Sequence, residues 1–201
     1  LSGAEMYNSI LSIAPSSVDR QTIWAGTDDG QLHLTRDGGK NWTNLTKRVS
    51  GMPQEAWIAR VISSEYQAGT AWLVVNNYRK GDYRPYLFRT DDYGTSWANV
   101  VDTDVVKGYA LSFIQDPVEP NLQFLGTENG LWVSSDDGGH WQAVENGYPS
   151  VSTMDLKIQR RESALIIGTF GRAIWVLDDL KSLREIAANR LQPVLTALPM
   201  N

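Results

Sequence analysis

Acidic side chains in Gly-rich turns are the clearest candidates for chemistry in this sequence. The stretch TRDGGKNW at 35–42 recurs as TDDYGTSW at 90–97 and as SSDDGGHW at 134–141. Each copy has a Ser or Thr, an Asp two residues later, a Gly two residues after that and a Trp three residues further on. The shared positions are Thr35, Asp37, Gly39 and Trp42; Thr90, Asp92, Gly94 and Trp97; and Ser134, Asp136, Gly138 and Trp141.

The three repeated Asp residues could bind a metal, act as acids, or fasten a turn. Their spacing does not match an EF-hand loop, which needs acidic residues at alternate positions and a closing Glu. Turn formation accounts for every position. An Asp side chain accepts hydrogen bonds from the backbone N–H groups that follow it, Gly adopts a positive φ, and the Trp begins the next strand and can lie against the turn. We therefore interpret the repeat as a clip between two strands.

A second group of carboxylates follows a different repeated motif. The stretches WAGTDDG at 24–30, FLGTENG at 124–130 and IIGTFGR at 166–172 each end an apolar run in Gly-Thr and a turn. Asp-Gly and Asn-Gly are strong hairpin-turn dipeptides, so a structural role is the first interpretation. A glycosidase needs two carboxyl groups about 5–10 Å apart. Asp29 and Glu128 are the weak candidates for such a catalytic pair.

Other kinds of chemistry have little support in the sequence. The two histidines, His33 and His140, fall in a strand and in a turn, so a two-His metal site is not expected. There is no cysteine, and no phosphate-binding, dinucleotide-binding or G-x-S-x-G motif. We expect no cofactor and no metal. The net charge of −5 argues against nucleic acid, and no apolar run is long enough for membrane insertion.

The motifs recur at the spacing of β-propeller blades. The three repeated Trp residues lie 55 and 44 residues apart, and periods of about 40–50 residues are typical of propellers. Short segments rich in β-branched and aromatic residues, bounded by Gly, Pro, Asp and Asn, predict four strands in each unit. We expect an all-β propeller segment over 1–179, with blades at about 8–47, 56–101, 108–145 and 151–179.

The fourth unit ends after three expected strands and has no copy of the Asp-Gly-Trp turn. Instead, 180–192 predicts a short helix with Leu183, Ile186, Ala187 and Leu191 on one face, followed by a tail that ends at 201. The last blade is therefore expected to be incomplete. The chain begins at Leu1 rather than at Met, and we expect it to be an excerpt of a longer or processed protein.

The pattern S/T-x-D-x-G-x-x-W resembles the Asp-box, also called the bacterial neuraminidase repeat. Asp-box propellers occur in sialidases, xyloglucan-active hydrolases, sortilin-type receptors and a photosystem assembly factor. The order of motifs over 8–185, including GTFGRAIWVLDDLKSLRE, is similar to the C-terminal half of the sortilin-like propellers of exported bacterial proteins, which often carry a glycosyl-hydrolase label. The resemblance implies that the Asp-boxes serve the fold and lie away from the functional face, and that the protein is extracellular or periplasmic.

The functional face is expected to carry the turns after the second strand of each blade and the links between blades. In the second unit the turn is replaced by the loop NNYRKGDYRPY at 76–86, whose aromatic and polar residues suit sugar or peptide recognition or packing against a neighbour. A sialidase would need three Arg residues around the carboxylate of its ligand. Arg60, Arg84 and Arg172 are scattered candidates for these. The candidate ligand-binding residues are Asp28, Tyr78, Arg79, Tyr83, Arg84, Phe170 and Arg172.

Three functions remain open from the sequence. The first is a non-catalytic binding and scaffold domain that holds a glycan or a peptide on the face opposite the Asp-boxes. The second is half of a glycoside hydrolase active site, sialidase-like or xyloglucanase-like, and the third is a protein–protein interaction platform. A propeller must close its ring or cover its ends. We expect a missing N-terminal half or a second copy of the chain to do so, a four-bladed ring being the remaining solution.

Overall fold

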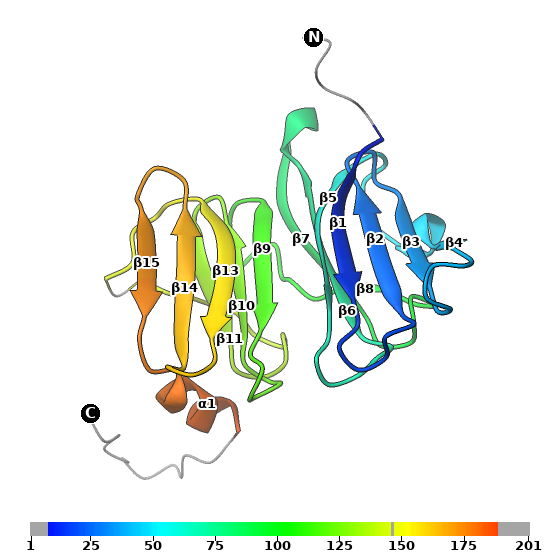
Figure 1. Ribbon diagram of the computed structural model, residues 1–201. Coiled ribbons are helices and arrows are strands. Elements are labelled where there is room, and N and C mark those ends of the chain that lie inside the picture. The colour runs from blue at the N-terminus through cyan, green and yellow to red at the C-terminus, as the bar shows by residue number, and fades with distance from the viewer. Residues whose placement is uncertain (1–7, 146, 189–201) are drawn as a thin grey trace.

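The computed structural model describes residues 8–145 and 147–188, and it confirms an all-β fold of propeller blades. Four antiparallel sheets stand side by side, and in each sheet the strands pair in chain order (Figure 1). The first two blades consist of β1 (Ile10–Pro15), β2 (Ile23–Thr27), β3 (Leu32–Thr35) and β4 (Thr43–Asn44), then β5 (Trp57–Ser63), β6 (Ala71–Asn77), β7 (Asp82–Thr90) and β8 (Ala98–Asn99).

The other two blades differ in their last strand. Blade 3 has four strands, whereas the described part of blade 4 has three and continues into a helix. Their elements are β9 (Ala110–Gln115), β10 (Gln123–Thr127), β11 (Gly130–Ser134) and β12 (Gln142–Ala143), then β13 (Thr153–Gln159), β14 (Ala164–Thr169), β15 (Ile174–Leu177) and α1 (Lys181–Ala187).

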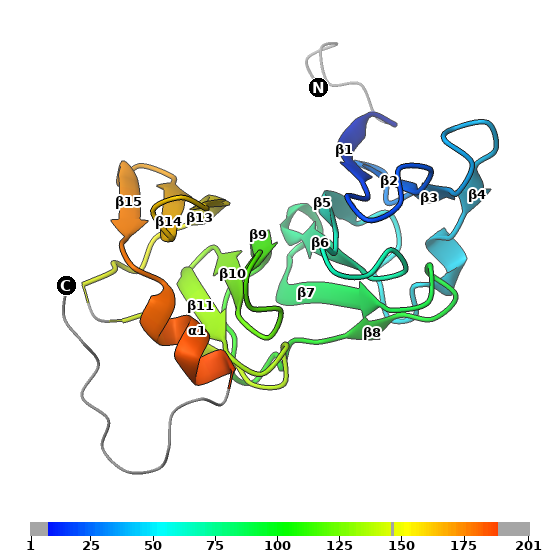
Figure 2. The same ribbon diagram turned by 60° about the horizontal axis from the view of Figure 1, so that its bottom comes forward.

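The blades form a curved row rather than a closed ring, with the first strand of each blade on the inner side (Figure 2). Side chains alternate between the two faces of a strand, so an inner blade needs apolar residues on both faces. The strand β6, AWLVVNN, meets this need: Trp72 and Val74 pack towards blade 3, while Leu73 and Val75 pack towards blade 1. Apolar residues on both faces of a strand therefore indicate a neighbouring blade on each side.

Three separate apolar clusters join consecutive blades. The first lies between blades 1 and 2 around Trp24 and Phe88, and the second lies between blades 2 and 3 around Trp72 and Phe113. The third joins blades 3 and 4 and includes Leu180 at the start of the helical segment. Each interface therefore has its own core, and removing apolar area from water at these interfaces supplies about 25 cal/mol per Å² towards folding.

The repeated Gly of the Gly-Thr motif allows the next blade to approach. A Cβ atom built on Gly26 would lie 2.5 Å from the Cγ2 of Ile58 in β5, and one on Gly126 would lie 2.5 Å from the carbonyl oxygen of Thr153 in β13. Any larger residue would push the neighbouring inner strand away. The motif is therefore a packing device between blades.

The helix α1 follows the third strand of blade 4 along the chain, where the other blades have a fourth strand, but it packs beneath blades 3 and 4 rather than beside β15 (Figure 1). It is shorter than expected, ending at Ala187, and positions 189–192 of the expected helix lie outside the described residues. Ala187 is buried and Leu183 packs against the third cluster, but the expectation for Ile186 was wrong, because its side chain is exposed. This short helix therefore contacts the blades through two apolar residues, Leu183 and Ala187.

The helix is fastened by a buried ion pair. The Arg184 guanidinium contacts the Asp116 carboxylate at 2.9 Å, with the two side chains 11% and 0% exposed. Asp116 also accepts the backbone N–H groups of Val118 and Glu119, and Arg184 donates to the hydroxyl of Ser163. Because every partner is satisfied, the buried charges are compensated. No described helix is long and apolar enough to cross a membrane.

Candidate functional site

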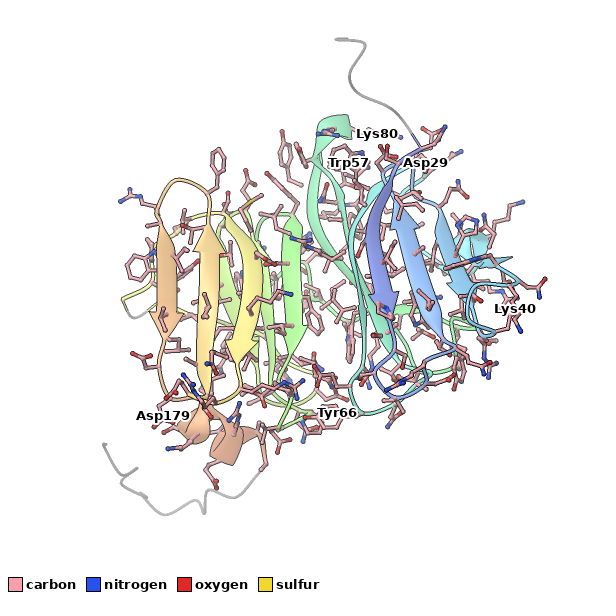
Figure 3. The ribbon with its side chains drawn as sticks, viewed as in Figure 1. Asp29, Lys40, Trp57, Tyr66, Lys80 and Asp179 are labelled. Atoms are coloured by element: carbon pink, nitrogen blue, oxygen red, sulfur yellow. The ribbon has the colours of Figure 1, made fainter. Side chains whose placement is uncertain are left out.

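The turns of the molecule are sorted onto two opposite sides. Figure 3 places Asp29 and Lys80, which follow second strands, and Trp57, which begins a first strand, at one end of the blades. Lys40, Tyr66 and Asp179, which follow first or third strands, lie at the other end. The Asp-boxes occupy this second side, which agrees with the arrangement expected from the strand order.

The three Asp-boxes share one hydrogen-bonding pattern. In the first, the Asp37 carboxylate accepts the Thr35 hydroxyl at 2.8 Å, the Asn41 backbone N–H at 2.9 Å and the Asn41 side-chain amide at 2.7 Å. Gly39 N–H donates back to the Thr35 hydroxyl oxygen at 3.0 Å. These bonds close the turn between β3 and β4, and they use the Asp side chain entirely within its own turn.

The residue four places after each Asp completes the clip, and the sequence argument had not singled it out. Ser96 donates its backbone N–H and its hydroxyl to Asp92 at 2.9 and 2.6 Å, as Asn41 does for Asp37. In the third box, His140 donates its backbone N–H to Asp136 and places its ring Nδ1 beside the same carboxylate. All three residues have a polar side chain that reaches the Asp four places earlier, which is the signal that the sequence offers.

The hydrogen bonds favour the charged form of the box carboxylates. The Asn41 backbone and side chain, with Thr35, lower the pKa of Asp37 to about 2, and Ser96, with Thr90, lowers the pKa of Asp92 to about 2. Burial alone would raise the pKa of Asp136, but the bonds from His140 and Ser134 outweigh it and the pKa is lowered. A general acid needs a raised pKa, so these groups are poorly suited to proton donation.

The Asp-box Trp residues pack against the preceding blade. Trp97 meets Trp24 of blade 1 edge to face, with ring centroids 5.9 Å apart, and Trp141 donates its indole N–H to the carbonyl of Val100 in blade 2 at 3.0 Å. Both are nearly buried, at 9% and 6% exposed, whereas Trp42 of blade 1 is 45% exposed. The turn also contacts its Trp, because the Trp97 Nε1 lies 3.3 Å from where a Cβ of Gly94 would stand.

On the side opposite the Asp-boxes, tyrosines from two blades form an aromatic cluster. Tyr78 in the loop after β6 stacks on Tyr109, which precedes β9, with centroids 4.6 Å apart, and Tyr83 lies 6.2 Å from Tyr109. Burial and the nearby Glu128 carboxylate raise the pKa of Tyr109. Tyr83 is 57% exposed, so the cluster, which we call the tyrosine cluster (Tyr78, Tyr83 and Tyr109), presents an aromatic surface to solvent.

The charged residues of the same loop are engaged with neighbours. Arg79 lies over the ring of Trp57 with its guanidinium carbon 3.2 Å from the centroid, and Arg84 makes a bidentate pair with Asp82. Arg84 lowers the pKa of Asp82, and burial, with the bond to Asp82, raises the pKa of Tyr86 to about 12. The loop is thus held in one shape by its own contacts.

The carboxylates of this side also have local partners. Asp28 is buried and accepts the backbone N–H groups of Asn8 and Ser9 at 2.9 and 2.7 Å, so it ties blade 1 to the segment before it. Asp29 accepts the hydroxyl of Thr27. Glu128 hydrogen-bonds through its backbone to Tyr109 and Ser152. The structure places Asp29 in blade 1 and Glu128 in blade 3, with blade 2 between them.

The remaining candidates are dispersed. Phe170 and Arg172 lie in the β14–β15 turn of blade 4, where Phe170 is 75% exposed. Arg60 lies on β5 and reaches Asp155 of β13 at 3.5 Å. With Arg84 held by Asp82, the three Arg residues of a sialidase-like site point to different partners and blades. In the described part of the chain, no three His, Cys, Asp or Glu side chains gather as a metal site.

A groove of about 340 Å³ follows the inner strands of the curved row. Ion pairs between blades 2 and 4 cross it, from Arg60 to Asp155 and from Arg160 to Glu65. Hydroxyl groups tie adjacent inner strands together, since Ser12 accepts the N–H of Val61 and Ser112 donates to the carbonyl of Thr153. The groove is polar and internally paired.

Two members of the aromatic surface, Tyr109 and Trp57, were not among the sequence candidates. Both lie in or beside the links between blades, which the strand order had assigned to this side without naming their residues. The available signal was their position at the start of a first strand: Trp57 begins β5 and Tyr109 directly precedes β9. Which tyrosine stacks on which depends on how blades 2 and 3 are juxtaposed, and that depends on the tertiary structure.

Comparison with solved structures identifies the same propeller fold in several proteins. YCF48 bound to D1 peptide matches with a TM-score of 0.61 and 19% identity over 85% of this chain and 51% of that chain. The GH74 xyloglucanase from Xanthomonas campestris matches with a TM-score of 0.69 and 15% identity over 86% of this chain and 29% of that chain. The GH74 enzyme from Niastella koreensis matches with a TM-score of 0.63 and 11% identity over 84% of this chain and 28% of that chain.

The extent of these matches bears on the architecture. The chain spans about half of the YCF48 chain and less than a third of the two GH74 enzymes, as expected for part of a larger propeller. No family model and no curated protein matches the sequence. At these identities the similarity shows the fold alone: the chain is a four-blade segment with the β-propeller fold.

Proposed function

We propose that this chain is a non-catalytic ligand-binding domain in a larger propeller of an exported bacterial protein, and that it holds a glycan or a peptide at the tyrosine cluster. The observation that carries the proposal is the stacking of Tyr78 on Tyr109 across two blades, with Tyr83 exposed beside them. A rigid aromatic surface on a long loop is a common basis for recognition.

The surroundings of the cluster support binding. Arg79 stacks on Trp57, and Asp82 fixes both Arg84 and Tyr86, so the loop loses little freedom when a ligand arrives. Glu128 provides a carboxylate that can accept hydrogen bonds from sugar hydroxyls or peptide N–H groups. Asp28 is not part of the proposed site, because its buried carboxylate is occupied by backbone N–H groups.

Further blades are needed to cover the two ends of the row. On blade 1, Ile13 and Trp42 are exposed, and on blade 4 the whole of β15 lacks a strand on its outer edge among the described residues. Exposed apolar faces and open sheet edges favour association. In the proposed assembly, the missing N-terminal half of the propeller or a second copy of this chain covers them.

Light scattering tests the assembly. The isolated chain is expected to self-associate, because its end faces resemble the faces that its own blades bury against each other. A mass equal to the monomer at all protein concentrations would contradict the proposal that the open ends pair. Coexpression with the upstream blades, where they exist in the same reading frame, should then abolish self-association.

Binding is tested by screening the whole chain on arrays of oligosaccharides and peptides and titrating the best ligand. Tyr78→Ala and Tyr83→Ala should each weaken that ligand about tenfold, since loss of a stacked aromatic contact costs about 1 kcal/mol or more. Tyr66→Ala, which removes a tyrosine on the opposite side, is the control. A ligand that binds all three variants like the wild type would exclude the tyrosine cluster as its site.

A further inference from the structure

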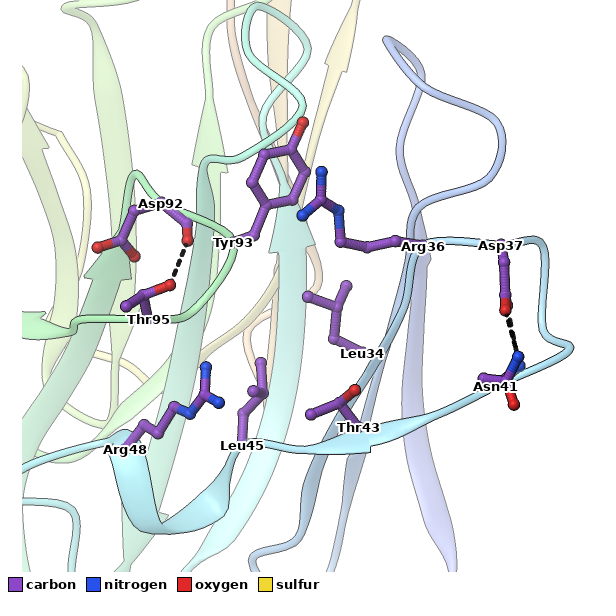
Figure 4. Close-up of a pocket in the computed structure, with 10 residues that line it drawn as sticks. All are labelled: Leu34, Arg36, Asp37, Asn41, Thr43, Leu45, Arg48, Asp92, Tyr93 and Thr95. Atoms are coloured by element: carbon purple, nitrogen blue, oxygen red, sulfur yellow. Dashed lines mark hydrogen bonds between the residues drawn. The ribbon is translucent and has the colours of Figure 1, made fainter.

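A hollow of about 390 Å³ lies on the Asp-box side between blades 1 and 2. Its walls come from the first two Asp-boxes and the segment after β4, and its apolar floor is formed by Leu34 and Leu45 (Figure 4). The volume falls within the about 300–1,000 Å³ of small-molecule sites. It is separate from the tyrosine cluster, which is on the other side of the blades.

Two guanidinium groups enter this hollow from different directions. Figure 4 shows Arg36, from the end of β3, and Arg48, from the segment after β4, both directed into it. Arg36 lies over the ring of Tyr93 with its guanidinium carbon 3.8 Å from the centroid, which leaves its N–H edge free. Within the described residues neither guanidinium has an ion pair or a side-chain hydrogen bond, in contrast to Arg60, Arg84, Arg89 and Arg184.

At the equivalent junction between blades 2 and 3, the Arg is paired with a carboxylate of the protein itself. There Arg89 pairs with Asp137 at 2.7 Å, and Gln123 donates to the other oxygen of that carboxylate. Asp137 is the residue that follows the box Asp, and its counterpart in the second box is Tyr93. A tyrosine offers Arg36 a ring face but no carboxylate, so the ion pair made at one junction is absent at the other, where Asp19 interacts with Arg36 only at longer range.

We propose that the hollow between Arg36 and Arg48 binds a sugar acid, with its carboxylate on the two guanidinium groups. The planar N–H fork of Arg matches the two oxygens of a carboxylate. The box carboxylates Asp37 and Asp92 also line the hollow, but hydrogen bonds within their own turns occupy them, so the two guanidinium groups supply the charged contacts to the ligand. Thr43 and Thr95 add hydroxyls to the rim, and the leucine floor suits the apolar face of a sugar ring.

Titration of the whole chain with glucuronate, followed by the amide resonances of the blade 1–2 junction, tests the proposal. Glucuronate should bind, and glucose, which lacks the carboxylate, should bind at least about tenfold more weakly, since a hydrogen bond to a charged group contributes about 1.5–3 kcal/mol. Glucose 6-phosphate separates carboxylate from phosphate recognition. Equal or tighter binding of either control sugar would overturn the assignment, as would a wild-type protein that does not bind glucuronate.

Substitutions locate the site. Arg36→Gln and Arg48→Gln should each weaken glucuronate about tenfold, and Arg161→Gln, which removes an exposed Arg on blade 4, should have no effect. The most specific variant is Tyr93→Asp. Tyr93 has a φ of 59° and Asp137 has a φ of 61°, so the substitution recreates a residue that the fold already accepts at the equivalent place.

The Tyr93→Asp variant should remain folded, pair with Arg36 and abolish binding, while Tyr93→Phe retains it. Unchanged affinity in Tyr93→Asp or in both Arg variants would exclude this hollow. The proposal does not rest on the function of the tyrosine cluster: Tyr83→Ala should leave glucuronate affinity unchanged, and a loss of affinity in that variant would place the ligand on the other side.

Discussion

The junctions on either side of blade 2 both contain a buried box Trp and an Arg, but these residues make different contacts at the two junctions. Between blades 2 and 3, Trp141 is bonded to the Val100 carbonyl and Arg89 is paired with Asp137. Between blades 1 and 2, Trp97 is equally buried but its indole N–H has no partner within the described chain, and Arg36 rests on Tyr93 without an ion pair to a described residue. Within the described chain each junction keeps a buried indole N–H without a partner, Trp97 at one and Trp72 at the other, so the difference lies in the arginine, which is paired at one junction and rests on a ring at the other.

This difference distinguishes the residues that the blade fold requires from the positions at which it tolerates different residues. Both junctions bury a box Trp, and both have a closed box turn, so these features belong to the fold. The residue after the box Asp varies between Tyr93 and Asp137 with no change in backbone conformation, since both have a positive φ. That position is therefore available for function, whereas the Asp itself is not.

Replacing the box Trp residues gives the largest effect that we expect. Trp97→Ala and Trp141→Ala should each lower the free energy of unfolding by about 3–5 kcal/mol, because each leaves a cavity between two blades. Trp42→Ala should cost less than about 1 kcal/mol in the monomer, since that ring is nearly half exposed. Urea unfolding at low protein concentration measures all three.

The same series sharpens the view of the open end. If the chain associates through blade 1, the cost of Trp42→Ala should rise with protein concentration as Trp42 becomes covered. A large cost at the lowest concentration would mean that Trp42 is already buried in the monomer, contrary to the described structure.

The junction of blades 3 and 4 provides the second prediction. Arg184→Ala should lower the free energy of unfolding by about 3 kcal/mol, because Asp116 is fully buried and would lose its counterion. The backbone N–H groups of Val118 and Glu119 still bond Asp116, which limits the loss. Arg161→Ala, whose partner Glu162 is exposed, is the control with a loss below about 0.5 kcal/mol. Equal effects of the two would remove the case for a buried pair at α1.

The third prediction addresses the two junctions directly. Arg89→Ala should cost about 1 kcal/mol, since Arg89 is mostly covered and its removal leaves Asp137 unpaired. Arg36→Ala should cost about 0.5 kcal/mol, the lower end of the range for an exposed cation–π contact. A double-mutant cycle on Arg89 and Asp137 isolates the pair, and a coupling energy near zero would show that the two junctions do not differ in this respect.

The smallest effect concerns pH and is common to all three boxes. The pKa values of Asp37 and Asp92 are about 2 in the folded chain against 3.8 for an ordinary Asp, and that of Asp136 is also lowered. Folding therefore favours the ionised form, so this stabilisation is complete above about pH 4 and is lost as the pH falls towards 2. Chemical unfolding between pH 6 and pH 2 measures it.

The matched variants for the pH experiment are single Asp→Asn substitutions in the boxes. Asp92→Asn should reduce the fall in the free energy of unfolding between pH 4 and pH 2, because one titrating group has been removed. Asp104→Asn, which replaces an exposed Asp outside the boxes, is the control and should leave the acid dependence of the free energy of unfolding unchanged. An identical acid dependence in the wild type and Asp92→Asn would contradict the hydrogen-bonded box.

The repeat made most of the fold predictable. Tight turns and short strands are local, so TRDGGKNW and its two relatives sufficed to predict the hairpins and a fourth sheet that has three strands among the described residues. The fold matched by YCF48 and the GH74 enzymes agrees with that prediction. The helix was predicted less well, because a face of one short helix depends on what it packs against, as the exposed Ile186 shows.

The candidate sites depended more on the tertiary structure. The loop at 76–86 was recognisable from its length and its tyrosines, but Tyr109 joins it from another blade. Likewise, Arg36 and Arg48 are ordinary exposed residues in the sequence, and only the packing of blade 2 on blade 1 makes a shared hollow of them. A sequence determines local hydrogen bonds and periodicity directly, whereas contacts between blades depend on the relative placement of distant strands.

The sequence by itself thus determined the blade, its clip and the side on which the clip lies, because those follow from bonds within a few residues. The tertiary structure decided which arginines form ion pairs and which do not, because Asp137 offers a carboxylate to the preceding blade where Tyr93 offers a ring. The Asp residues that first suggest chemistry serve the turns, and the residue beside them determines whether a junction is closed or open to a ligand.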